Sequence, residues 1–102
     1  MPEALVGGAD FLAITDSARQ HILELFVTKP KGAFRIRCEP GPETTLFLFD
    51  WDTGYTEDDF EFMCGAATVV MDALSIAYIL DDYVLDHVFG KFTLEKRSIN
   101  AI

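Results

Sequence analysis

The hydrophobic pattern along the chain changes period several times, and the first change marks a helix. Apolar residues recur at helical spacing on one face, at Ala18, Ile22, Leu25 and Phe26. Thr15 or Asp16 can accept hydrogen bonds from the free amides of its first turn. Pro30 and Gly32 end the helix, because proline lacks a donor and disfavours helical geometry in the residue before it. The pattern therefore predicts one packed amphipathic helix.

After this break the period becomes two. Phe34 to Arg37 alternates apolar and basic residues, which predicts a strand with one face in water. Leu46 to Phe49 is apolar at every position, which predicts a strand covered on both sides. Residues 39–42 read Glu-Pro-Gly-Pro and turn the chain between the two strands. The pair is expected to form a hairpin, followed by a polar acidic loop over residues 50–59.

The second half of the chain predicts further strands around one short helix. Phe60 to Phe62 and Thr68 to Met71 are expected strands. Residues 73–80 suit either a short helix or a buried strand by periodicity, and the helix is favoured because Asp72 can cap it. Residues 83–89 and 92–95 alternate around a Gly-Lys pair and predict a closing hairpin.

These elements define a fold class that is mainly β with α (α+β). We expect a β-sandwich or flattened barrel of roughly six or seven strands, with an N-terminal amphipathic helix and a second short helix. At 102 residues one domain is the default. We assign residues 1–13 to a lead-in or an added edge segment and residues 14–102 to the domain.

The net charge of the chain limits the classes of partner that it is expected to bind. Seventeen acidic and eight basic residues give a net charge of -9, which repels phosphate backbones and anionic lipid headgroups. The longest nearly apolar run, residues 73–80, is far shorter than the roughly 20 residues that cross a bilayer. We therefore expect neither nucleic acid nor membrane as a partner.

The beginning of the chain and its cysteines suggest a compartment. Arg19 is the first basic residue, and no cleavable apolar stretch precedes it, so no secretory signal is expected. Cys38 and Cys64 are the two cysteines. We expect a cytoplasmic protein in which both thiols are reduced.

Four short strings then match a known family in order. They are Ile14 to Ala18, Val70 to Ser75 followed by Tyr78-Ile79, Leu85 to Val88, and Gly90 to Phe92. Together they resemble the HesB-like domain of the A-type iron-sulfur cluster carriers, over about residues 14–100. The chain departs from the family pattern after the short helix, where Asp81 and Asp82 stand in place of a usual Gly. The resemblance implies the fold described above and a relation to iron-sulfur cluster assembly.

The same resemblance implies a site that this sequence does not supply. Members that carry iron or clusters use three cysteines, one in a loop after the first strand and two in a C-terminal Cys-Gly-Cys, because clusters require soft thiolates. Here the loop over residues 39–45 holds no cysteine, and the C-terminal pair is missing. Cys38 and Cys64 could still present four thiolates in a symmetric dimer. Core packing is the favoured interpretation of each, since free cysteine is among the most buried residue types.

Other candidate sites have less support in the sequence than the two cysteines. Carboxylates that could take a hard cation are Glu57, Asp58, Asp59, Glu61, Asp81 and Asp82, but the calcium-loop pattern is absent and a solvated loop is favoured. His21 and His87 lack metal-ligand spacing, and Ser17 and Ser75 are not in a nucleophile elbow. No enzyme activity and no cofactor are expected.

We therefore expect a divergent HesB-like protein, related to iron-sulfur cluster assembly, that acts as an adaptor or regulatory binding protein without conventional cluster ligation. Its expected partners are other proteins and a second copy of itself. Two alternatives remain: a protein-interaction module unrelated to metal that reuses the fold, or a dimer that binds iron or a cluster through Cys38 and Cys64.

Overall fold

The computed structural model describes residues 12–79 and 83–96. Its elements, in chain order, are β1 (Ala13–Ile14), α1 (Asp16–Thr28), β2 (Ala33–Pro40), β3 (Thr45–Asp52), β4 (Phe60–Cys64), β5 (Ala67–Met71), α2 (Ala73–Ile79), β6 (Tyr83–Val88) and β7 (Lys91–Lys96). Most of the expected lead-in segment, residues 1–11, lies outside the described residues, as do Asp81 and Asp82 and residues 97–102. Neither helix in the described ranges is long and apolar enough to cross a membrane.

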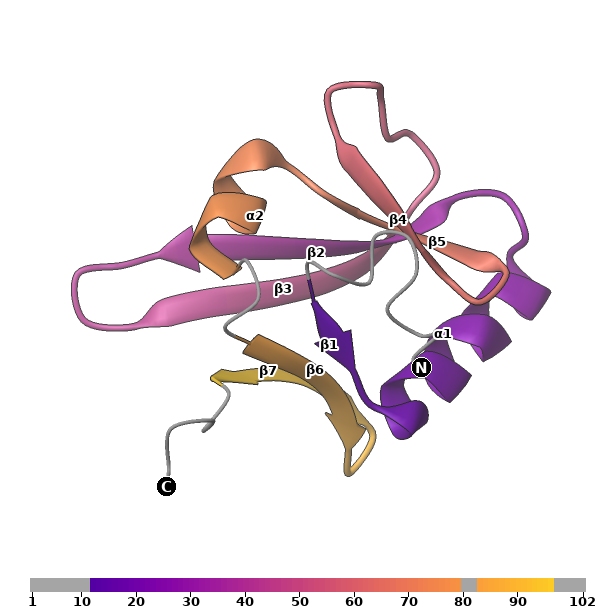
Figure 1. Ribbon diagram of the computed structural model, residues 1–102, viewed down its shortest axis with the longest axis horizontal. Helices are drawn as coiled ribbons and strands as arrows, with labels where there is room; N and C mark the ends of the chain where they lie inside the picture. The colour runs from indigo at the N-terminus through magenta and orange to yellow at the C-terminus, as the bar shows by residue number, and fades with distance from the viewer. Residues whose placement is uncertain (1–11, 80–82, 97–102) are drawn as a thin grey trace.

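The strands form two sheets, so the expected mainly β fold with two helices is confirmed. One sheet has the order β3-β2-β5-β4 and the other the order β1-β6-β7. In the first, β2 pairs antiparallel with β3 and parallel with β5. Figure 1 shows the long β2–β3 hairpin with α2 beside it, while α1 lies toward the other end of the molecule. The predicted hairpins at residues 34–49 and 83–95 are both present.

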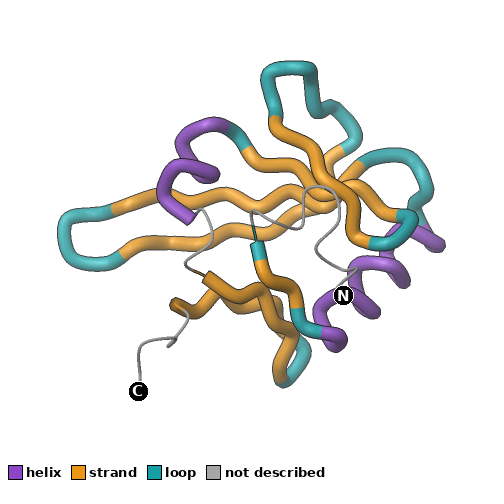
Figure 2. Tube along the Cα trace, in the orientation of Figure 1, coloured by secondary structure: helices purple, strands orange, loops and turns teal. Residues whose placement is uncertain are grey.

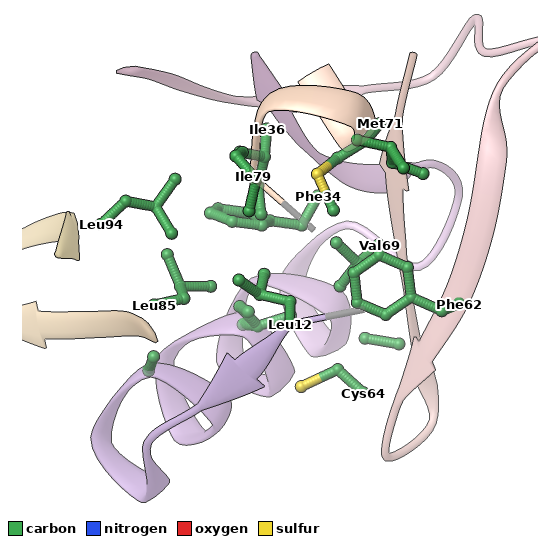
Figure 3. Packing of buried hydrophobic residues seen from close by; sticks show 14 of the residues in the cluster. Leu12, Phe34, Ile36, Phe62, Cys64, Val69, Met71, Ile79, Leu85 and Leu94 are labelled. Atoms are coloured by element: carbon green, nitrogen blue, oxygen red, sulfur yellow. The ribbon is translucent and has the colours of Figure 1, made fainter. Parts of the chain in front are cut away.

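The core lies where the two sheets and α1 meet. Phe34 and Ile36 point into it from β2, together with Val69 of β5 and Leu85 of β6, and all four are buried. Figure 3 shows these side chains converging, with Phe62 and Cys64 at the β4 end of the cluster. The Phe34 ring lies 4.6 Å from the Phe92 ring of β7, which joins the two sheets.

Residues 12 and 13, at the end of the segment expected to be a lead-in or an added edge segment, lie within the fold. Leu12 is buried in the core, and Ala13, which the sequence assigned to the lead-in segment, pairs in parallel with Val84 of β6. Of the two expected caps of α1, Thr15 is the one used: its hydroxyl accepts from the Ala18 amide at 3.2 Å. The same hydroxyl donates to Asp86 of β6 at 2.7 Å, so the start of α1 is tied to the second sheet.

Two expectations for the β2–β3 hairpin are wrong. The strand at Leu46 to Phe49 is not covered on both sides, because only the face with Phe47 and Phe49 packs on the core and alternate residues face outward: Leu46 is 57% exposed and Leu48 is 41% exposed. Arg35 does not face water, since only 6% of it is exposed. The loop after β3 covers Arg35, and it begins only at Thr53 because β3 continues through Asp52.

The helix α2 lies beside the part of β2 that does not pair with β5. The β2–β5 pairing includes Phe34 and Arg35, and β5 ends at Met71. Asp72 then caps α2 as predicted, because its carboxylate accepts from the Ser75 amide at 2.8 Å. The Ser75 hydroxyl, in turn, accepts from the Cys38 amide of β2 at 3.0 Å. A serine side chain therefore satisfies a strand amide that would otherwise be buried without a partner.

We predict that Ser75→Ala destabilises the protein by about 2 kcal/mol, because it leaves the buried Cys38 amide without an acceptor. The measurement is urea unfolding followed by circular dichroism. Ser17→Ala is the matched control, since the exposed Ser17 hydroxyl donates to the His87 carbonyl, which water can satisfy equally well. Equal losses in the two variants would contradict the role assigned to Ser75.

Candidate functional site

Cys38 lies in β2, on the face that points into the core. It is 3% exposed and belongs to the same buried cluster as Phe34 and Ile36. Burial raises the pKa of its thiol, and the negative charge of Asp72 raises that pKa further. The side chain is therefore held as a neutral thiol, which is a poor metal ligand and a poor nucleophile.

Cys64 occupies the last position of β4, before the Gly65-Ala66 turn. It is also 3% exposed, and its burial raises the pKa of the thiol, although the nearby positive charge of Arg19 and a hydrogen bond from Arg19 partly oppose this. In Figure 3 its sulfur points toward the packed side chains rather than away from them. Both cysteines thus occupy the core positions that the sequence favoured.

The sheet register keeps the two thiols apart within one chain. Phe34 of β2 is level with Val69 of β5, and Ala67 of β5 is opposite Cys64 of β4. Cys38 lies four residues beyond this level and Cys64 about two residues before it, which separates them by about 20 Å along the strands at ~3.3 Å per residue. The intervening strand β5 adds about 10 Å across the sheet.

These residues do not fit a conventional iron or cluster site. Such a site needs several thiolates around one metal, whereas each protonated thiol here is alone in its part of the core. Across residues 12–79 and 83–96, no three side chains of His, Cys, Asp or Glu are grouped so that they could hold a metal ion.

The acidic loop between β3 and β4 has a different role from cation binding. Its residue Asp59 accepts two hydrogen bonds from the guanidinium of Arg35, at 2.7 and 3.0 Å, and Asp52 accepts a third from Nε at 2.7 Å. The two carboxylates raise the pKa of Arg35, and the hydrogen bonds from Arg35 and from loop amides lower the pKa of both aspartates. The loop is the teal segment at the top of Figure 2.

This network uses the central carboxylate of the predicted acidic cluster. Asp59 is committed to Arg35, while Glu57, Asp58 and Glu61 are exposed. The sequence reasoning missed the network because it placed Arg35 on a wet face. The local signal in the sequence was the run Asp52-Thr53-Gly54, which is typical of a turn. In the structure the Asp52 carboxylate accepts from the Gly54 amide at 2.7 Å.

The structure also brings together the rings of the two histidines, His21 and His87, which the sequence did not predict. The His21 ring of α1 stacks on the His87 ring of β6, with centroids 3.5 Å apart. His21 Nδ1 donates to the Ser17 carbonyl at 3.0 Å, which turns the ring toward β6. The Phe92 ring meets His87 edge to face at 4.7 Å.

These rings border a cavity of about 250 Å³ between α1 and the β6–β7 hairpin. Its wall is completed by Glu24, Leu25 and Thr28 of α1. In the sequence the two histidines are 66 positions apart, so no spacing rule links them. Their meeting depends on α1 packing against β6.

Comparison with known proteins identifies the fold. The chain resembles the crystal structure of Escherichia coli SufA, which is involved in biosynthesis of iron-sulfur clusters, with a TM-score of 0.70 and 21% identity over 84% of this chain and 80% of that one. It also resembles a protein from Aquifex aeolicus solved by NMR, with a TM-score of 0.67 and 26% identity over 85% of this chain and 92% of that one. No family model matches the sequence, and no curated protein matches it. The fold expected from the HesB-like strings is therefore confirmed as a fold.

The lowered pKa values of Asp52 and Asp59 predict how stability depends on pH. In an unfolded chain an aspartate has a pKa of about 3.9. Because the folded values are lower, the ionised pair stabilises the protein fully above about pH 5, and this contribution is lost as the pH falls through 3.9 and below. Asp59→Asn should cost about 3 kcal/mol near pH 7, because Arg35 stays buried with fewer partners.

The measurement is the free energy of urea unfolding between about pH 2 and pH 7. Asp59→Asn should also show a shallower loss of stability with acid than the unmodified protein. Asp58→Asn, at the exposed neighbouring position, is the control. If Asp58→Asn and Asp59→Asn behaved alike, Arg35 would not depend on Asp59.

Proposed function

We propose that this chain is a divergent HesB-like protein that acts in iron-sulfur cluster assembly as an adaptor or regulatory binding protein. It works through contacts with other proteins and does not ligate a cluster in the conventional way. The relation to cluster assembly is supported by the fold that the chain shares with SufA. We further propose that the protein is cytoplasmic and has no enzyme activity.

The placement of the two thiols carries this proposal. Cys38 and Cys64 are buried, their pKa values are raised, and two sheet positions and about 20 Å of strand separate them. Holding one cluster between them would require each thiol to leave the core and lose its proton. Both changes oppose the packing of β2 and β4, so the fold favours use of the outer surface over use of sulfur.

The absence of ligation is tested by anaerobic purification followed by measurement of iron, sulfide and visible absorption, before and after incubation with iron and sulfide. We expect a colourless protein with far less than one iron per chain. Cys38→Ser and Cys64→Ser are matched variants and should behave as the unmodified protein does. A colour that disappears in either variant would overturn the proposal and restore the thiolate-bridged dimer.

The adaptor role is tested in a cluster-transfer reaction from loaded SufA to an apo-acceptor protein, followed by visible absorption. An adaptor should change the transfer rate in proportion to its concentration, whereas an unrelated acidic protein of similar net charge should not. An unchanged rate would favour the alternative in which the fold serves contacts unrelated to iron.

A further inference from the structure

The cavity between α1 and the β6–β7 hairpin has walls of two kinds. Three walls are rings: His21 stacks on His87 with centroids 3.5 Å apart, and Phe92 meets His87 edge to face at 4.7 Å. The other walls come from α1, and among the described residues that line the cavity only Glu24 has a formal charge at neutral pH. Lys91, which precedes Phe92 on β7, points to the opposite face of that strand. The cavity is therefore aromatic with one negative group in its wall.

The polar atoms of this wall accept hydrogen bonds. Because Nδ1 of His21 donates to the Ser17 carbonyl, Nε2 of the neutral ring carries the lone pair. The Thr28 hydroxyl donates to the Glu24 carbonyl, so its oxygen is left as an acceptor. Across residues 12–79 and 83–96, neither the Glu24 carboxylate nor the ring nitrogens of His87 have a hydrogen-bond partner. A guest that carries donors and positive charge fits this arrangement.

A guanidinium meets both requirements. It is always charged, has five N–H donors in a planar fork and has no acceptor. The fork pairs with a carboxylate through two parallel hydrogen bonds, and the plane stacks on aromatic rings. An ammonium has the same charge but is more strongly hydrated and has only three donors. The volume of about 250 Å³ accommodates a guanidinium together with the methylene groups that carry it.

The turn of the same hairpin indicates that the guanidinium belongs to a protein segment. Phe89 is 99% exposed, and its φ of 52° is a conformation that bulky side chains rarely adopt. It lies two residues from His87, which is about 7 Å along an extended chain. A small guanidinium compound in the cavity leaves the Phe89 ring in water. An extended segment covers it with the residue two positions from its arginine.

We propose that this cavity binds an arginine side chain of a basic protein partner. Glu24 pairs with the guanidinium, the three rings contact its plane, and Phe89 contacts an apolar residue two positions away in the partner. The net charge of -9 attracts a partner of opposite charge, whereas a second copy carries the same net charge. The inference rests on the proposed function, since it gives the protein contacts a surface. Its test involves neither iron nor cluster transfer, so the two proposals can fail separately.

The probe is the capped peptide acetyl-Leu-Gly-Arg-Gly-Leu-amide, which has an apolar residue two positions to either side of its arginine. It is titrated into the full chain, and binding is followed by the NMR signals of the His21 and His87 rings and of the backbone amides. We expect saturable shifts confined to the residues around the cavity, with a Kd of about 1 mM or below. The absence of such shifts up to about 10 mM peptide would overturn the proposal.

Two related peptides test the chemistry of the guest. Citrulline is a neutral isostere of arginine, and the peptide that contains it should bind at least ~10-fold more weakly. The lysine peptide should bind roughly 3- to 10-fold more weakly, because an ammonium lacks the planar fork. If the citrulline peptide bound as tightly as the arginine peptide, the cavity would not be a cation site.

Glu24→Gln tests the carboxylate. It keeps the size of the side chain, removes its charge and should weaken binding of the arginine peptide by at least ~10-fold. Glu57→Gln is the matched control, because it changes the net charge equally at an exposed position that does not line the cavity. Circular dichroism and thermal unfolding verify that both variants fold. Equal binding by the two variants would overturn the pairing with Glu24, since net charge alone would then explain any loss.

Phe89→Asn tests whether the guest is part of a longer segment. This variant should keep or raise Tm, because Asn suits a positive φ. It should weaken binding of the pentapeptide by roughly 3- to 10-fold and leave binding of acetyl-arginine amide unchanged, because the single residue does not reach the turn. If both probes lost affinity equally, or if neither did, the assignment of the guest to an extended protein segment would be wrong.

Discussion

The buried guanidinium of Arg35 is the constraint around which the larger sheet is arranged. A charge this far from water must be paired, and its partners Asp52 and Asp59 come from the end of β3 and from the loop before β4. The loop therefore has to close over the outer face of β2. The strands β2, β3 and β4 are held in one relative position, and Asp59, the central carboxylate of the acidic cluster, is already hydrogen-bonded to Arg35.

The positions of the two thiols in the same sheet limit the sulfur chemistry that the protein can perform. One face of β2 supplies the core, and Cys38 is on that face together with Phe34 and Ile36. Cys64 reaches the core from β4, at the opposite end. A fold shared with SufA is thus combined with thiols that serve as small apolar side chains. This combination leaves the outer surface as the part of the molecule that is available for contacts with other proteins.

Much of the fold could be predicted from local pattern, and the failures have a common cause. The two helices, their Thr15 and Asp72 caps and both hairpins follow from periodicity and turn chemistry within a few residues. The face assignments of Arg35 and Leu48 failed because they depend on what covers each side of the sheet. An apolar run cannot reveal that only one face of its strand will be covered, and a basic residue cannot reveal that a loop will return to cover it.

The sequence by itself determined where the chain forms helices and strands, and it showed that only two thiols, those of Cys38 and Cys64, are present in these 102 residues. Only the tertiary structure decided that these thiols are far apart, that Asp59 neutralises Arg35, and that His21 stacks on His87. The reason is physical: helical and strand periods are set by neighbours a few residues away, whereas these contacts join segments up to 66 positions apart and exist only after the sheets and α1 have packed.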